Sequence, residues 1–152
     1  MNISNYNLKS KLYDNFRQNT PGWDKIKDII NITPGDTILD LGCGSGAFIN
    51  KLSIFKPSLI HGIDPSSDMI NIAKNKLSYS NVLLECNYVS NLPSNNYDCV
   101  FSAQVIQNLT LDTSVVKQTR YSFYREIYRI LKPGGQLIIT TRNSNPNYSN
   151  LY

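Results

Sequence analysis

The residues best suited to chemistry in this chain are Asp40 and the three glycines that follow it, Gly42, Gly44 and Gly46. They stand at the end of a short apolar run, residues 37–41, that is typical of a buried strand. A strand that breaks into a glycine-rich turn and then a helix is the opening of a nucleotide-binding unit, because glycine has no Cβ to hold a ligand away from the backbone. Asp40 would repel a dinucleotide pyrophosphate but attract a ligand that carries a positive amino group.

Three further groups follow later predicted strands, and parallel strands bring such ends to one edge of a sheet. Asp64 follows the second strand, roughly 20 residues beyond the glycine turn, where an acid can accept both hydroxyls of a ribose. Asn87 and Tyr88 follow the third strand, where a side-chain amide and a backbone N–H can meet the edge of a base. Ser102 ends the fourth strand and would line the floor beneath a reacting group.

Each of these groups also has a purely structural interpretation. The spacing of Gly42, Gly44 and Ala47 also fits the dinucleotide fingerprint, so the glycines alone leave the ligand open. Asp64 could simply begin a turn or a helix. Asn87 could be ordinary loop polarity.

Three other positions are interpreted as structural. Asp98 follows an aromatic residue at the start of a strand, where capping of a neighbouring loop is favoured over catalysis. His61, the only histidine, falls within a strand and is expected to be packed or hydrogen-bonded rather than a general base. Gly134 and Gly135 are expected to end a helix and turn into the last strand, since no helix follows them.

The elements that would position these groups follow from apolar periodicity and from turn residues. Strands are predicted at residues 37–41, 59–63, 82–84, 97–102 and 136–141. Helices are predicted at residues 4–17, 23–32, 45–55, 66–77 and 118–131, with Ser66 or Ser67 capping the fourth. This alternation predicts an α/β fold: a Rossmann-like, doubly wound sheet of about five parallel strands, with helices on both faces and the first strand in the centre.

The composition indicates one ordinary domain over residues 1–152, with residues 142–152 as a polar tail. Hydrophobic residues make up 41% and charged residues 17%, no apolar run has membrane-spanning length, and a cytoplasmic location is expected. Lysines and arginines are scattered and the net charge is only +4, so no nucleic-acid partner is indicated. Cys43, Cys86 and Cys99 share no metal-ligand spacing and are expected to be reduced and mostly buried.

Four ordered segments resemble the motifs of class I S-adenosylmethionine-dependent methyltransferases. They are residues 38–46, 62–66, 97–100 and 129–135, and the similarity runs from about Trp23 to Thr141. The resemblance implies a transferase with S-adenosyl-L-methionine as cofactor and S-adenosyl-L-homocysteine as product. In-line transfer of an activated methyl group needs alignment more than acid or base catalysis, so we assign no catalytic residue and expect no metal.

The resemblance also implies roles in cofactor binding. Asp40 and the glycine loop would hold the methionine end, and Asp64 the ribose hydroxyls. Pro65 and Met69 would pack near the adenine, with Asn87 and Tyr88 at its edge. Residues 1–22 are similar to a lid segment that closes over the cofactor, with Trp23 at its end. The complete set of implied cofactor-binding residues is Tyr13, Asp40, Gly42, Cys43, Gly44, Asp64, Pro65, Met69, Asn87, Tyr88 and Ser102.

The chain departs from the family pattern at three points. Many members carry an aspartate where Asn87 stands, and many small-molecule members carry a histidine near Gln107 and Asn108. With Gln104, these last two are the polar residues nearest the expected pocket floor, and none is a base. The family's final antiparallel hairpin is expected to be missing, which leaves the last strand as an edge open to a second copy or to a partner chain.

These observations leave three hypotheses, in order of preference. The first is methyl transfer to a small-molecule acceptor by in-line displacement. The second is a truncated or partner-dependent S-adenosylmethionine-binding module without independent catalysis. The third is a nicotinamide-dependent oxidoreductase, which keeps the glycine loop but explains neither Asp40 nor the turn at residues 132–135.

Overall fold

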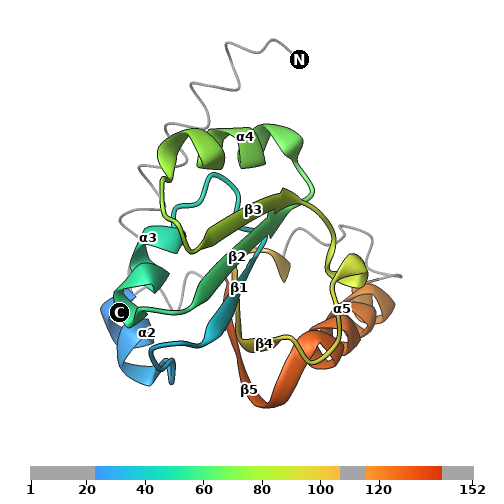
Figure 1. Cartoon of the computed structure of the whole chain (residues 1–152). Helices are drawn as coiled ribbons and strands as arrows, with labels where there is room; N and C mark the ends of the chain where they lie inside the picture. The colour runs from blue at the N-terminus through green and yellow to red at the C-terminus, as the bar shows by residue number, and fades with distance from the viewer. Residues whose placement is uncertain (1–22, 107–115, 142–152) are drawn as a thin grey trace, which may run out of the picture.

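A five-stranded parallel β-sheet forms the centre of the computed structural model, which describes residues 23–106 and 116–141. The strands are β1 (Thr37–Leu41), β2 (Leu59–Asp64), β3 (Val82–Cys86), β4 (Tyr97–Ala103) and β5 (Leu131–Thr140). Their order across the sheet is β3-β2-β1-β4-β5, and every neighbouring pair is parallel (Figure 1). The predicted fold class and the central place of the first strand are confirmed.

Helices cover both faces of this sheet. The first face carries α2 (Trp23–Ile29), α3 (Ile49–Leu52) and α4 (Ser67–Lys76), and the second carries α5 (Val116–Ile130) (Figure 1). Two short 3-10 helices, η1 (Ser53–Phe55) and η2 (Val89–Asn91), follow α3 and β3.

The alternation of side chains along the strands divides the core into two layers. On the first face, Ile38 and Phe101 of the sheet are buried with Ile49 of α3 and Ala73 of α4. On the second face, strand residues are buried with one side of α5; the cluster is Leu39, Leu41, Ile63, Leu92, Tyr97, Val100, Phe123, Ile127 and Ile130. These layers hold the strand ends in fixed positions relative to one another.

Two predicted elements differ most from the structure in their bounds. The helix expected at residues 45–55 consists only of α3 and η1, because residues 44–48 form turns that continue the glycine loop. The last strand begins at Leu131, directly after α5, and not at Gln136. Leu131 pairs with Tyr97 and Gln136 pairs with Cys99, so the glycine turn expected between helix and strand lies inside β5 as a register shift.

Among the described residues, β3 and β5 are the two edge strands. No helix of this part of the chain has the length and apolar character needed to cross a bilayer. The predicted helix at residues 4–17, the lid segment with Tyr13, the tail, and the candidates Gln107 and Asn108 all lie outside the described residues.

Candidate functional site

Asp40 lies near the carboxyl end of the central strand, where β1 is flanked by β2 and β4. Its neighbours in register are Gly62 and Phe101, and its side chain is almost fully buried, with 1% exposed. A carboxylate removed from water is costly unless polar or charged groups surround it. The strand then turns sharply, since Gly42 N and Cys43 N both donate to the Ile63 carbonyl, at 2.9 and 3.0 Å.

Asp64, at the end of β2, ties the glycine loop to the start of α4. Its Oδ2 accepts a hydrogen bond from Gly44 N at 3.0 Å, and its Oδ1 accepts one from Ser66 N at 2.9 Å. A carboxylate offers about four acceptor positions, so each oxygen can still accept a second donor. Asp64 can therefore accept ribose hydroxyls while it keeps the loop in place.

The backbone at Gly44 leaves room for a ligand. Gly44 has a φ of +54°, and no atom lies within 4 Å of the position that a Cβ would occupy. Next to it the Cys43 thiol is buried, and burial together with the charges of Asp40 and Asp64 raises the pKa of this thiol well above its ordinary value. Cys43 is therefore a neutral group that lines the loop and not a nucleophile.

The start of α4 carries the two residues expected beside the adenine. Ser66 caps the helix, as predicted, because its side chain accepts from Met69 N at 3.4 Å. Pro65 is exposed and Met69 is half-buried. Cys86, whose thiol donates to the Pro65 carbonyl at 3.4 Å, is exposed, so the expectation of buried cysteines is wrong at this position. Cys86 is the last residue of β3, which among the described residues has a neighbouring strand, β2, on one side only.

Asn87 and Tyr88 lie beside Asp64, since Asn87 N donates to the Asp64 carbonyl at 3.2 Å. The side-chain oxygen of Asn87 accepts from Tyr88 N and from Asn91 Nδ2, both at 2.9 Å. The amide oxygen and the backbone N–H expected at a base edge are thus bonded to each other, and an adenine would have to exchange with them. Tyr88 itself is 61% exposed.

The ends of β4 and β5 bring polar groups to the same edge of the sheet. The Ser102 side chain is fully buried, and its hydroxyl has no hydrogen-bond partner in the described part of the chain. Gln104 has a φ of +57°, which residues other than glycine rarely adopt, and its N–H donates to the Thr140 carbonyl at 2.7 Å. Trp23, expected at the end of a lid, instead packs its ring against Phe48 and Phe101.

The residues interpreted as structural have that role. His61 is buried between Tyr97 Oη, 2.6 Å from Nδ1, and Glu85 Oε2, 2.9 Å from Nε2. Asp98 accepts from Thr37 N at 2.8 Å and from Lys132 Nζ at 2.7 Å, at the opposite edge of the sheet. Burial opposes ionisation of Asp98, but these two hydrogen bonds and the lysine charge together hold its pKa below the ordinary value.

Two surface grooves are formed by other parts of the molecule. One of about 590 Å³ lies along α5, between Tyr121, Tyr128 and the loop residue Asn95. The other, of about 450 Å³, lies at the amino edge of the sheet beside Asp36 and Asp98. Neither groove is lined by the residues expected to bind a nucleotide. The candidate site is therefore identified by the polar residues at the carboxyl edge of the sheet and not by the volume of a groove.

One residue that holds this site together was not singled out from the sequence. Arg129 of α5 donates hydrogen bonds to the segment that follows Tyr88, including one to the Leu92 carbonyl at 2.7 Å. In the sequence, Arg129 stands out only as the first residue of the segment 129–135. That position does not reveal a contact with Val89, which lies 40 positions earlier in the chain.

Comparison with known proteins gives relatives along most of the chain. The family model described as a methyltransferase domain matches residues 39–139. A carboxy-S-adenosyl-L-methionine synthase of Trichodesmium erythraeum is 35% identical over 113 residues, which are 72% of this chain and 43% of that protein. A ubiquinone/menaquinone biosynthesis C-methyltransferase of Vibrio cholerae is 31% identical over 120 residues, which are 74% of this chain and 43% of that protein. The chain thus spans less than half the length of these relatives.

The solved structures support the fold. The S-adenosylmethionine-dependent methyltransferase of Mesorhizobium loti superposes with a TM-score of 0.67 at 22% identity, over 84% of this chain and 56% of that one. The family match covers the glycine loop, the strand ends that surround it and all but the last residue of β5. The chain therefore belongs to the methyltransferase domain family.

Proposed function

We propose that this domain binds S-adenosyl-L-methionine at the carboxyl edge of its sheet and transfers the methyl group to a small-molecule acceptor. The observation that carries the proposal is the link from Asp64 to the glycine loop beside the buried Asp40. It provides one carboxylate near the loop for a positive amino group and a second, still open to donors, for a ribose. The uncrowded backbone at Gly44 supports the same assignment.

The remaining residues of the site take roles that suit their positions. Pro65 and Met69, at the start of α4, would cover the adenine, and Asn87 with Tyr88 would meet its edge after exchanging their mutual hydrogen bond. Gly42 and Cys43 would hold the loop on the Ile63 carbonyl. We further propose that Ser102 lines the floor, that Tyr13 belongs to a lid formed by residues 1–22, and that the whole chain is one domain.

The mechanism proposed is alignment for in-line displacement. When bound, the cofactor supplies a methyl group activated by its sulfonium, and this group passes to the acceptor atom while the sulfur keeps the bonding electron pair. Asp40 and Asp64 are assigned to binding, so neither is free to act as a general base. The chain contributes by holding both reactants at near-attack distance, which is worth effective molarities of about 10⁵ M or more.

The class of acceptor rests on the relatives. One is the quinone-pathway C-methyltransferase of Vibrio cholerae, and another is a phosphoethanolamine N-methyltransferase of Plasmodium falciparum, 29% identical over 76% of this chain and 42% of that protein. Both names describe small molecules as the methylated compounds or their pathway. We propose a small molecule for this domain too, with Gln104, at the strained end of β4, as the described side chain closest in the fold to the acceptor.

A second candidate function is cofactor binding without methyl transfer. It is favoured by relatives whose names describe activities other than methyl transfer. One is the carboxy-S-adenosyl-L-methionine synthase, and another is the [4+2]-cyclase SpnF, 28% identical with a TM-score of 0.61 over 80% of this chain. Among the described residues β5 is an edge strand, and this edge is where we would place a second copy or a partner chain.

The two functions are separated by turnover of S-adenosylmethionine labelled in its methyl group. The purified chain is incubated with the cofactor and a panel of small amines, phenols and quinones, and the label is followed into the extracted products. Methyl transfer predicts labelled product, and much less of it in Asp64→Asn when the cofactor concentration is below the wild-type Kd. Cofactor binding by calorimetry, with no label transferred to any acceptor and none when partner chains are added, would contradict methyl transfer and support the second function.

A further inference from the structure

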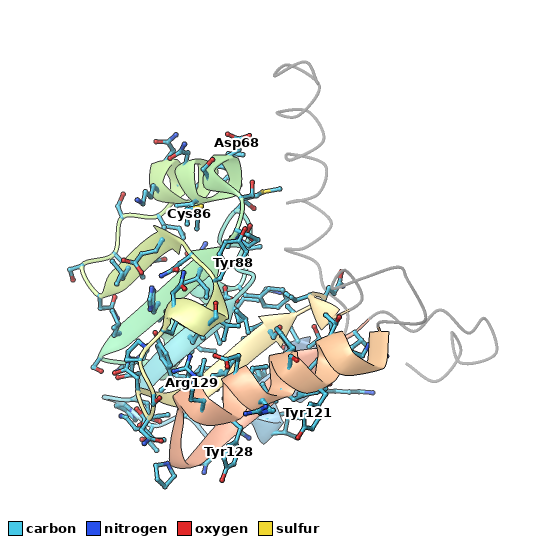
Figure 2. All side chains as sticks on the ribbon, turned by 90° about the vertical axis from the view of Figure 1, so that its right-hand side faces the viewer. Asp68, Cys86, Tyr88, Tyr121, Tyr128 and Arg129 are labelled. Atoms are coloured by element: carbon cyan, nitrogen blue, oxygen red, sulfur yellow. The ribbon has the colours of Figure 1, made fainter. Side chains whose placement is uncertain are left out.

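The guanidinium of Arg129 is the centre of a hydrogen-bond network that joins α5 to the segment after β3. Its Nη1 donates to the Leu92 carbonyl at 2.7 Å and to Ser94 Oγ at 3.1 Å. Its Nη2 donates to the carbonyls of Val89 and Ser90, at 3.2 and 3.4 Å. Figure 2 shows Arg129 near the end of α5, on the side of the molecule that also carries Tyr88.

The same guanidinium is also bonded to a carboxylate of its own helix. Glu126, one turn earlier on α5, accepts from Arg129 Nε at 2.9 Å and from Nη2 at 2.8 Å. Both side chains are about one-third exposed, so the ion pair by itself adds little to stability. Its geometric effect is larger, because one carboxylate oxygen, Glu126 Oε2, accepts from both Nε and Nη2. These two bonds fix the plane of the guanidinium, and its remaining N–H groups are directed at the loop.

The loop that Arg129 holds continues directly into the proposed adenine contact. Asn91 Nδ2 donates to Asn87 Oδ1 at 2.9 Å, and Asn91 N donates to the Tyr88 carbonyl at 3.1 Å. Leu92 is buried in the second core layer, which anchors the far end of the loop. Arg129 therefore holds the carbonyls on both sides of Asn91, and the Asn91 side chain is in turn bonded to the side chain of Asn87.

We infer that Arg129 is a positioning residue that sets the adenine selectivity of this domain by holding the segment 87–92 in register with Asp64. The inference rests on the proposed function. A lysine cannot replace Arg129, because an ammonium is a point charge that cannot span several carbonyls and a carboxylate in one plane. In this proposal the arginine acts through the loop and not by contact with the ligand, so its effect must be measured as selectivity and not only as affinity.

The test compares two ligands that differ at the edge of the base. Affinities for S-adenosyl-L-homocysteine and for S-inosyl-L-homocysteine, which carries an oxygen in place of the adenine amino group, are measured by calorimetry. We expect the wild-type chain to prefer the adenosyl compound by about tenfold or more, the effect of one mismatched hydrogen bond. In Arg129→Lys and Arg129→Gln this ratio falls to within about twofold of unity, mainly because the adenosyl compound binds less well.

The matched control is Arg125→Gln. Arg125 lies one turn earlier on the same helix, is exposed, and stacks on the Tyr121 ring with 6.0 Å between its Cζ and the ring centroid. This variant removes the same charge without touching the loop and is expected to keep the wild-type ratio. If the Arg129 variants weaken both ligands equally and keep the ratio, Arg129 is only a structural residue and the inference is overturned.

Two further outcomes are distinguishable. A wild-type chain that binds neither ligand would refute the proposed function, and the inference with it. A wild-type chain that binds both ligands equally well would refute recognition of the adenine amino group by Asn87, but it would not contradict the proposed cofactor. If Arg129→Gln does not fold, hydrogen exchange in Arg129→Lys replaces it: we expect faster exchange of the Asn91 and Leu92 amides, and unchanged rates would overturn the inference.

Discussion

The consequence of replacing Asp64 by asparagine can be worked out from its two hydrogen bonds. Asp64 accepts from Gly44 N and from Ser66 N with its two carboxylate oxygens. An asparagine has one oxygen, so one of the two N–H groups would face an amide NH₂ instead of an acceptor. Loss of one charged hydrogen bond costs about 2 kcal/mol. We therefore expect Asp64→Asn to lower the free energy of unfolding by about that amount.

Binding should be weakened by a similar amount for a separate reason. The ribose hydroxyls would lose a charged acceptor, which again is worth about 2 kcal/mol and corresponds to about a 30-fold higher Kd. The assay is calorimetric titration with S-adenosyl-L-homocysteine at a temperature where circular dichroism shows that the variant is folded. Urea unfolding of the same samples gives the loss of stability independently.

The control for this experiment is Asp68→Asn, because Asp68 is an exposed carboxylate in the first turn of α4, the helix that begins three residues after Asp64. It lies near Asp64 along the chain but on the solvent side of α4 (Figure 2). We expect its Kd to stay within about twofold of wild type. If Asp64→Asn also binds S-adenosyl-L-homocysteine within twofold of wild type while folded, Asp64 does not hold the ribose and the reasoning is wrong.

Three other outcomes follow from the structure. Gly44→Ala and Gly35→Ala each force an alanine into a positive φ with no steric clash, so both variants should lose about 1–2 kcal/mol of stability. Only Gly44→Ala should lose binding of S-adenosyl-L-homocysteine. Equal binding by the two variants would contradict a close approach of the ligand to the loop. Because the pKa of Asp98 is held below its ordinary value, the ionised side chain stabilises the fold above pH 4, and this effect is lost as the pH falls through the folded pKa. In urea unfolding, the free energy of unfolding should therefore fall less between pH 6 and pH 3 in Asp98→Asn than in wild type. Of the three cysteines, Cys86 alone should react with a thiol reagent in the native state, and rapid reaction of all three would refute the burial of the other two.

The order of strands and helices could be predicted from the sequence because the fold depends on short apolar runs separated by strong turn signals. The strand at residues 37–41 and the capping by Ser66 are confirmed because each depends on local chemistry. The helix after the glycine loop was predicted too long, since the loop continues as turns through Phe48 before α3 begins. The spacing of apolar residues alone does not show at which residue the turns of a loop end and a helix begins.

The candidate site was predicted less completely than the fold. Asp40, Gly44 and Asp64 come together because strand ends of a parallel sheet share an edge, which the sequence pattern implies. The mutual bond between Asn87 and Tyr88 is local, but its cost to a ligand becomes visible only in the structure. The network of Arg129 depends on the packing of α5 against η2, and no spacing in the sequence could have predicted it.

The most direct test of the central claim is a pair of calorimetric titrations of the purified, folded chain, one with S-adenosyl-L-homocysteine and one with NAD. The account predicts saturable binding of S-adenosyl-L-homocysteine and no binding of NAD, because the buried carboxylate of Asp40 disfavours a pyrophosphate beside the glycine loop. Tight binding of NAD with no response to S-adenosyl-L-homocysteine would contradict it.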